Sequence, residues 1–214
     1  MNILRIICSP RGRASESYRL SQSIVDQLIA TAPGATPAVL DVDATTLPLV
    51  DPDYAAALSA PQDPSDGRQD RGALGRSTGL IQSLQDASHL VIATPMHNFT
   101  VPASLKTWID HVVRVRSTFQ ITARGKEGSL ADRPVYVAIS SGGGFGGGAH
   151  SQPDFLTPYL RHVLGTIGLK DVTFFSVQGT ARGESALHEA RVQARAEIAA
   201  HSYAAGAQPL FQAA

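Results

Sequence analysis

The stretch HLVIATPMHNFTVPASLKTWIDHVV, residues 89–113, indicates most directly how this chain folds. Residues 89–94 form an apolar run typical of a buried strand, and Pro95 ends it. The bulky or amide-bearing residues at 96–99 then stand where they could offer a flat heterocycle apolar contact and backbone hydrogen bonds. Beyond them, apolar residues recur at helical spacing: Leu105, Trp108, Ile109, Val112 and Val113. In the competing interpretation Met96 and Phe99 only cap the core, and this unit taken alone favours that reading.

Short apolar runs alternate with longer amphipathic ones over the rest of the chain. Strands are predicted at 2–8, 38–42, 89–94, 133–140 and 171–177, and helices after the N-cap Ser15, at 78–87, 102–115, 155–168 and 183–203. This alternation predicts an α/β fold, a doubly wound five-stranded parallel sheet with helices on both faces. The segment 51–76 has the Pro, Asp and Gly content of a loop and is expected to be mobile. We expect a single domain over 1–214.

The composition limits the function classes. The 214 residues carry a formal net charge of zero and contain 43% hydrophobic residues, so the chain can bury a core but lacks the basic surplus of a nucleic-acid-binding protein. Its one cysteine, Cys8, excludes an intramolecular disulfide and fits a reducing compartment. No apolar run approaches the ~20 residues of a membrane span. We therefore expect a soluble, cytoplasmic protein without nucleic-acid or membrane partners.

A parallel sheet of this kind binds ligands beyond the carboxyl ends of its strands. The loop after the first strand carries Ser9, Arg11, Arg13, Ser15 and Ser17 and leads into a helix N-terminus, which favours an anion such as a terminal phosphate. Ordinary capping by Ser15 beside solvated arginines explains the same residues equally well.

The loop after the fourth predicted strand, SSGGGFGGGAH at 140–150, is rich in glycine. Gly142, Gly144 and Gly147 match G-x-G-x-x-G, but this run follows a late strand, and no acidic residue lies at 162–166, so a dinucleotide fingerprint is disfavoured. A flexible connector is the alternative to a loop that approaches the edge of a planar ring with bare backbone.

Taken together, these blocks resemble the FMN-dependent NADH:quinone oxidoreductases known as azoreductases, which have a flavodoxin-like fold. The resemblance runs over nearly the whole chain and is weakest across 51–76, and a few motifs carry it. They are P-M-x-N-F-x-x-P-x-x-L-K at 95–106, TF at 118–119, G-x-E-G at 125–128, SSGG at 140–143 and the segment 157–172.

The resemblance implies bound FMN, with NADH or NADPH as electron donor. Its phosphate would be held by Ser9, Ser15, Glu16 and Ser17. The isoalloxazine and ribityl chain would be lined by Met96, His97, Asn98 and Phe99. The opposite ring edge would lie along Ser140, Ser141, Gly142 and Gly143. In the implied ping-pong cycle the nucleotide gives a hydride to the flavin, and a quinone or azo compound then takes two electrons.

The resemblance also implies a homodimer with shared active sites. The apolar stripe of the helix 102–115 and the segment 119–130, which has few helix or strand signals, are the regions expected to face the partner. His97, Ser141, Ile121 and Thr166 depart from common family residues, and the glycines 146–148 have no counterpart, so substrate range is the part most open to change.

Some residues favour no separate chemistry. The histidines other than His97 show no repeated ligand spacing, so no metal is expected, and Cys8 fits a packed apolar position better than a nucleophile. His97 is the one candidate for proton transfer, since histidine titrates near neutral pH. The alternative functions are a non-enzymatic electron carrier of the flavodoxin type and an FMN-binding redox sensor.

Overall fold

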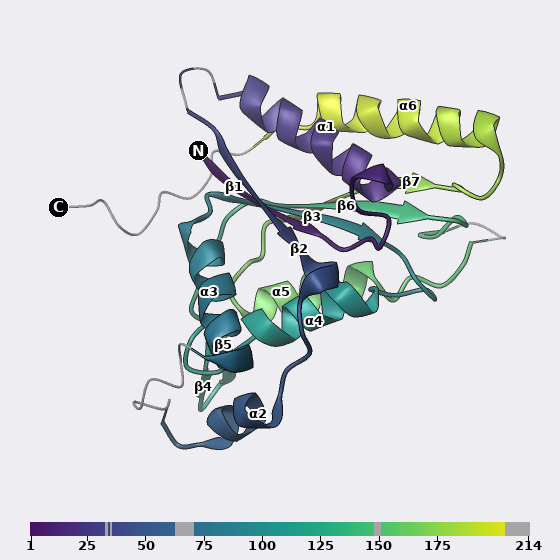
Figure 1. Ribbon diagram of the computed structural model, residues 1–214. Coiled ribbons are helices and arrows are strands. Elements are labelled where there is room, and N and C mark those ends of the chain that lie inside the picture. Colours follow the sequence, from purple (N-terminus) through teal and green to yellow (C-terminus); the bar gives the residue numbers. More distant parts are fainter. Residues whose placement is uncertain (33, 35, 63–70, 148–150, 204–214) are drawn as a thin grey trace.

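Five parallel strands form the centre of the computed structural model, which describes residues 1–32, 34, 36–62, 71–147 and 151–203. They are β1 (Asn2–Ile7), β2 (Ala38–Asp43), β3 (His89–Pro95), β6 (Val135–Ser141) and β7 (Val172–Gln178), in the order β2-β1-β3-β6-β7. Every residue of β3 is buried, because helices cover both faces of the sheet (Figure 1). The predicted doubly wound parallel sheet is confirmed.

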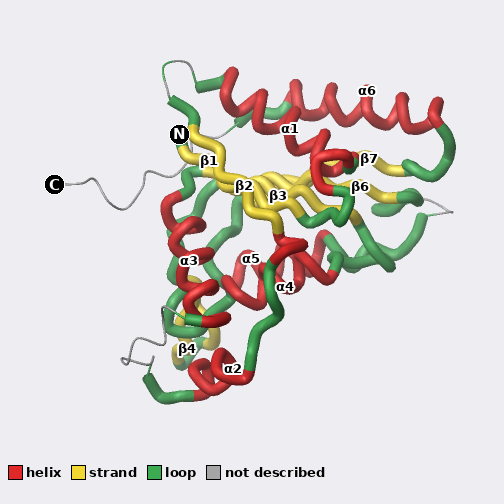
Figure 2. The backbone as a smooth tube through the Cα atoms, in the orientation of Figure 1, coloured by secondary structure: helices red, strands yellow, loops and turns green. Residues whose placement is uncertain are grey.

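The helices form two layers, as Figure 2 shows. On one face lie α1 (Glu16–Ala30) and α6 (Glu184–Ala200), and on the other α3 (Gly72–Asp86), α4 (Ala103–Val112) and α5 (Thr157–Thr166). The predicted helical spacing in α1 is confirmed, because Leu20, Ile24 and Leu28 are all buried against the sheet. No helix in the described part of the chain is long and apolar enough to cross a membrane.

The α4 stripe does not have the surface role that was expected of it. Trp108 and Val112 are fully buried and Ile109 is 3% exposed, and they belong to a large core that also includes side chains of α3 and α5. The sequence pattern identified an apolar face correctly, but this face packs inside the same chain. It therefore cannot present these side chains to a second subunit.

Two segments predicted as irregular contain regular structure. Within 51–76, α2 (Pro52–Ser59) begins at an Asp51 N-cap whose carboxylate accepts from Tyr54 N at 2.7 Å, and α3 already starts at Gly72. Asp followed by Pro at the first helical position is a helix-start signal that the loop-like composition hid. Residues 63–70, part of the expected mobile loop, lie outside the described residues.

The segment 119–130 holds an antiparallel hairpin of β4 (Phe119–Thr122) and β5 (Gly125–Gly128). Its four-residue strands are too short to give a clear alternating pattern. The hairpin base packs so closely against the backbone just after α5 that a Cβ on Gly128 would clash with Gly168 N. Close packing of backbone against backbone fixes the hairpin to the domain.

The strand order brings distant loops to one edge of the sheet. From β1 the chain crosses to β2 on one side and later to β3 on the other. The loops after β1, β3 and β6 therefore meet at the carboxyl edge, where such folds bind ligands.

Candidate functional site

A cavity of ≈ 460 Å³ opens at this carboxyl edge. It falls within the ~300–1,000 Å³ typical of small-molecule sites. Its wall comes from the loops after β1, β3, β6 and β7 and from one side of α1 and α6: Ser9, Pro10, Arg11, Ser15, Glu16, Arg19, Pro95, Met96, His97, Ser140, Gly142, Thr180, Leu187 and Arg191. We call the part formed by residues 9–19 with Arg191 the α1 end. The loops at 96–99 and 140–143, which contribute Met96, His97, Ser140 and Gly142 to the wall, are the β3–β6 end.

At the α1 end the serine hydroxyls are already bonded within the protein. Ser15 Oγ donates to Gly12 O at 2.7 Å and accepts from Tyr18 N at 3.2 Å, so Ser15 is the N-cap of α1 as predicted. Ser17 is fully buried, with its Oγ 3.3 Å from Ser15 Oγ. Ser9 Oγ accepts from Arg11 N at 3.2 Å. Because the Tyr18 N–H is already bonded to Ser15 Oγ, an anion here would meet the backbone N–H groups of Glu16 and Ser17, which have no acceptor inside the helix.

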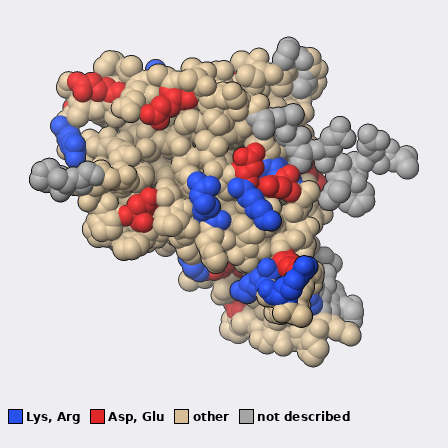
Figure 3. Space-filling model, turned by 180° about the vertical axis from the view of Figure 1, so that it is seen from behind, with Lys and Arg blue, Asp and Glu red and all other residues tan. Residues whose placement is uncertain are grey.

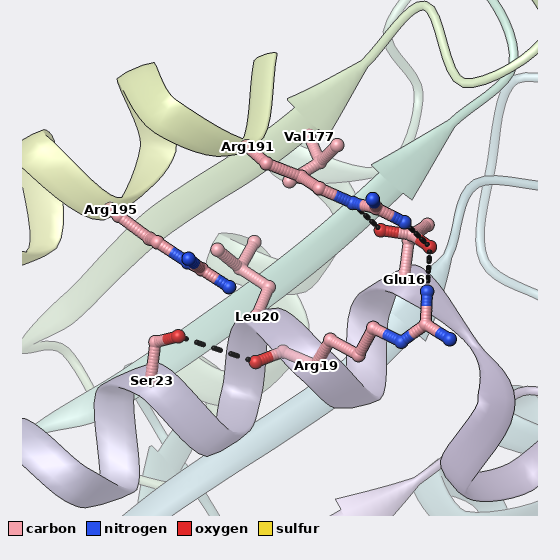
Figure 4. A pocket seen from close by; sticks show the side chains of 7 residues that line it. All are labelled: Glu16, Arg19, Leu20, Ser23, Val177, Arg191 and Arg195. Carbon is pink, nitrogen blue, oxygen red and sulfur yellow. Dashed lines mark hydrogen bonds and ion pairs between the residues drawn. The ribbon is translucent and has the colours of Figure 1, made fainter. Parts of the chain in front are cut away.

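Glu16 is tied to two arginines at the same end. Arg191 donates through Nε to Glu16 Oε2 at 2.8 Å and through Nη2 to Oε1 at 2.6 Å, while Arg19 Nη1 donates to Oε1 at 2.7 Å (Figure 4). The hydrogen bonds from Arg191 are the main cause that lowers the pKa of Glu16, and burial opposes them. At neutral pH the Glu16 carboxylate is therefore charged and can contribute only its backbone N–H to an anion.

At the β3–β6 end the loop after β3 makes a tight left-handed turn. His97 and Thr100 exchange backbone hydrogen bonds at 3.0 Å, and the two residues between them have positive φ, 48° at Asn98 and 70° at Phe99. Asparagine tolerates this region, whereas a bulky phenylalanine there is strained. Met96 is 8% exposed and Phe99 45% exposed. Only Met96 therefore fits the alternative of capping the core.

The glycine loop is fixed over 140–147 by the segment after β7 and by Gln152, so it is not a loose connector there. Thr180 N donates to Ser141 O at 3.0 Å and Gln152 N to Gly144 O at 2.8 Å, with a longer bond of 3.4 Å from Gly179 N to Gly143 O. The Gln152 amide also bridges the two sides of this end, because its Nε2 lies 2.8 Å from Ser141 Oγ and 3.0 Å from Met96 Sδ. A Cβ on Gly143 would lie 3.1 Å from Gln152 Oε1. Gly148 and His150 lie outside the described residues.

The structure brings most of the predicted site residues together. The cavity wall contains Ser9, Ser15, Glu16, Met96, His97, Ser140 and Gly142. Next to wall residues but outside the wall itself are Ser17, Asn98, Phe99, Ser141 and Gly143. Sequence reasoning missed Arg19, Gln152, Thr180 and Arg191. Arg19 lies one helical turn after Ser15 and was within reach of a spacing argument, whereas Arg191 is 175 residues from Glu16 and gave no local signal.

Other titratable residues add no chemistry to the cavity. Cys8 is fully buried in the core, and this burial raises the pKa of its thiol, in agreement with a packed apolar role. Among the described residues no three His, Cys, Asp or Glu side chains gather as metal ligands do. The glycines that follow β6 do not lead directly into a helix, since α5 starts only at Thr157. This spacing argues further against a dinucleotide-binding fingerprint.

The cavity suits a flat ring that bears an anionic group. Its α1 end offers guanidinium groups and a helix N-terminus, and its β3–β6 end offers Met96, unencumbered glycine backbone and a rigid loop pair. FMN has this combination of an anionic tail and a planar ring. The residues present therefore fit the cofactor that the resemblance implies.

Comparison with known proteins agrees with this geometry. A family model described as a flavodoxin-like fold matches residues 1–202. The chain is 43% identical over 210 residues to FMN-dependent NADH:quinone oxidoreductase 4 of Pseudomonas fluorescens, which covers 98% of this chain and 96% of that protein. It is also 43% identical over 192 residues to FMN-dependent NADH:quinone oxidoreductase 5 of Burkholderia lata, with 90% and 92% covered.

Among solved structures, an azoreductase from Bacillus anthracis superposes with a TM-score of 0.78 at 20% identity, over 93% of this chain and 97% of that one. An FMN-dependent NADH-azoreductase from the same species, in complex with FMN, gives 0.76 at 22% identity over 92% and 98%. At these identities the superpositions establish the fold. The two oxidoreductases, at 43% identity over most of both chains, are similar enough in sequence to establish the family as well.

Proposed function

This chain belongs to the flavodoxin-like family of FMN-dependent NADH:quinone oxidoreductases, and on that premise we propose that its carboxyl-edge cavity binds FMN and reduces quinones with electrons from NADH. Azo compounds are a second substrate class, suggested by the structural neighbours. We also propose a cytoplasmic location, because a chain with one cysteine forms no intramolecular disulfide, which is typical of a reducing compartment.

The observation that carries the proposal is the division of one cavity into a charged and an uncharged end. Arg19, Arg191 and the α1 N-terminus occupy one end, and Met96 with Gly142 occupies the other. A phosphate placed at α1 leaves the β3–β6 end for the ring. We therefore assign the predicted phosphate residues to backbone and hydroxyl contacts at α1, and Met96–Phe99 and Ser140–Gly143 to the ring.

In the reaction, bound FMN would supply the hydride chemistry, and the protein would bind, orient and stabilise. The N–H groups of Gly142 and Gly143 donate to no acceptor among the described residues, so they can face an electron-rich ring edge without a charged side chain. Gln152 donates to both Met96 Sδ and Ser141 Oγ and so links the loop after β3 to the end of β6. His97 is exposed at the mouth, where it can donate a proton to product alongside solvent.

A catalytic role is favoured over an electron carrier of the flavodoxin type. Carriers of this type are strongly acidic proteins that dock on redox partners, whereas this chain has a formal net charge of zero. On the face seen in Figure 3, basic and acidic side chains lie in small groups separated by uncharged surface. Over the described residues, that face shows no continuous patch of one sign of charge, the feature that would steer a charged redox partner to it (Figure 3).

The test is a turnover assay on protein whose heat-released cofactor has been identified by mass spectrometry. We expect FMN, bleaching of its absorbance by NADH, recovery on adding benzoquinone, and steady NADH oxidation that fits a ping-pong rate law. FAD or no flavin after reconstitution would contradict the cofactor assignment. Flavin that is reduced but does not turn over would favour the carrier or the sensor.

We also propose a homodimer whose partner completes the β3–β6 end. With the α4 stripe buried, the surface that supports this is the exposed apolar set that includes Ile121 on the β4–β5 hairpin at 72% and Leu49 at 77% exposure. Ile121→Asp should lower both the dimer fraction and quinone turnover, and Val192→Asp, a 54% exposed position on α6, is the control. Light scattering that finds a fully active monomer would contradict the shared site.

A further inference from the structure

The groove between α1 and α6 holds more positive than negative charge. Its volume is ≈ 260 Å³, and its lining contains Arg19, Arg191 and Arg195 with Glu16 as the one acid (Figure 4). Arg191 and Arg195 are one helical turn apart on α6, a spacing at which like charges destabilise a helix. One carboxylate shared by two guanidinium groups does not balance three. The arrangement therefore favours a further anion nearby.

The groove adjoins the carboxyl-edge cavity, and the two share Glu16, Arg19 and Arg191. Arg195 lines the groove but not the cavity. It is exposed, and its side chain has no bonded partner among the described residues. The side chains of Arg191 and Glu16 are 34% and 14% exposed. Of the two arginines on this stretch of α6, Arg191 is thus the one whose guanidinium reaches the wall where the α1 N-terminus begins.

Glu16 and a bound phosphate would compete for the same positive charge. A carboxylate in the first turn stabilises its own helix, but it repels a dianion placed at that N-terminus unless cations neutralise it. The planar guanidinium fork binds carboxylate and phosphate oxygens with the same bidentate geometry. Arg191, which binds Glu16 through this fork and also lines the cavity, can therefore pair with either acceptor.

We propose that Arg191 of α6 is a phosphate-binding residue of the cofactor site, and that Glu16 holds its guanidinium ready beside the α1 N-terminus. The inference rests on the proposed function, because the phosphate is that of FMN. It adds to the β1–α1 loop a ligand from the last helix of the fold. Docking of α6 and retention of the cofactor are then linked through one side chain.

Titrations of the apoprotein with FMN and with riboflavin, which lacks the phosphate, test this assignment. Arg191→Ala should weaken FMN binding about ten- to a hundredfold, since hydrogen bonds to charged groups are worth about 1.5–3 kcal/mol, and should leave riboflavin binding unchanged. Arg195→Ala, the matched control on the same helix, should change FMN affinity less than about twofold, the scale of an exposed unpaired charge. Glu16→Gln frees both guanidinium groups and should bind FMN at least as tightly as wild type.

Three results would overturn the assignment while leaving the proposed function in place. They are unchanged FMN affinity in Arg191→Ala, an equal loss for both flavins, and a Glu16→Gln variant as weak as Arg191→Ala, which would mean that Arg191 only positions Glu16. If Arg191→Ala fails to fold by circular dichroism, Arg191→Lys decides, because losing the fork should weaken FMN alone. A wild-type chain that binds neither flavin would overturn the proposed function and this assignment together.

Discussion

The two ends of the cavity are built in opposite ways. At the α1 end, Ser15, Ser17 and Glu16 have partners inside the protein, and those partners come from α1, its preceding turn and α6. At the β3–β6 end, Phe99 stands half exposed on a left-handed turn and His97 beside it is exposed. Charge needs preformed partners because burying it unpaired is costly. A planar ring needs open surface, and at this end the protein leaves the turn exposed, with the backbone strained at Phe99.

The largest effect should come from filling the β3–β6 end. A valine at Gly143 would displace the Gln152 amide, since even a Cβ lies 3.1 Å from its Oε1, and would break the bridge between Ser141 and Met96. Overpacking and one lost hydrogen bond predict a loss of flavin affinity of about a hundredfold. Gly142→Val, in the cavity wall, should also weaken flavin binding.

Gly147→Val is the control for these variants. Its Cβ would meet nothing within 4 Å, but its φ of +133° disfavours any side chain, so it should lower thermal stability more than flavin affinity. FMN titrations with parallel melting curves would separate the two effects. Equal loss of affinity at all three positions would show that the loop acts as one rigid unit, and the proposed division of the cavity would need revision.

How well each end could be predicted follows from the range of its contacts. Spacing along the sequence reveals features that depend on residues within a few positions of one another. These are the N-cap Ser15, the buried faces of α1 and α4, and the strand ends near Met96 and Ser140. The Arg191–Glu16 pair joins residues 175 apart, and the orientation of α4 depends on how α3 packs. Neither has a local signature. The left-handed turn at Asn98 and Phe99 was also hidden, because phenylalanine is not a residue that predicts positive φ.

The next effect should arise at the α1 end, from replacing both Ser15 and Ser17 with Ala. Loss of the N-cap should lower the free energy of unfolding by about 1 kcal/mol. FMN retention should weaken as well, by about tenfold or more if either hydroxyl turns to the phosphate, the worth of one charge-assisted hydrogen bond. Chemical denaturation and FMN titration measure the two.

Ser23→Ala is the matched control on α1, because its hydroxyl makes only a 3.4 Å contact to Arg19 O. It should change neither quantity. A double serine variant that loses stability but binds FMN like wild type would assign the phosphate to backbone and arginine alone.

A smaller effect of opposite sign is expected at the strained turn. Phe99→Gly removes a side chain held at a φ of 70° and should raise the free energy of unfolding by about 1 kcal/mol. Quinone turnover should fall in the same variant if Phe99 contacts the ring. Phe155→Ala, at an exposed aromatic without positive φ, should give no gain in stability, and a Phe99→Gly variant less stable than wild type would show that the turn is held by side-chain contacts.

The smallest effect is the pH dependence of the ion pair at the α1 end. Hydrogen bonds from Arg191 are the first cause that lowers the Glu16 pKa, so the folded state binds this proton less readily than the unfolded chain. The stabilisation is therefore complete above the unfolded pKa of about 4.3 and is lost as pH falls through the lower folded value.

Because the pair is partly exposed, we expect Arg191→Ala to lower the free energy of unfolding by no more than about 1 kcal/mol at pH 7. Urea unfolding of both proteins from pH 7 to pH 3 should show this gap unchanged to about pH 5 and closing below about pH 4. A gap that persists at pH 3 would mean that Arg191 stabilises α6 by packing, and the ionic contrast between the two ends would then be weaker than the hydrogen bonds suggest.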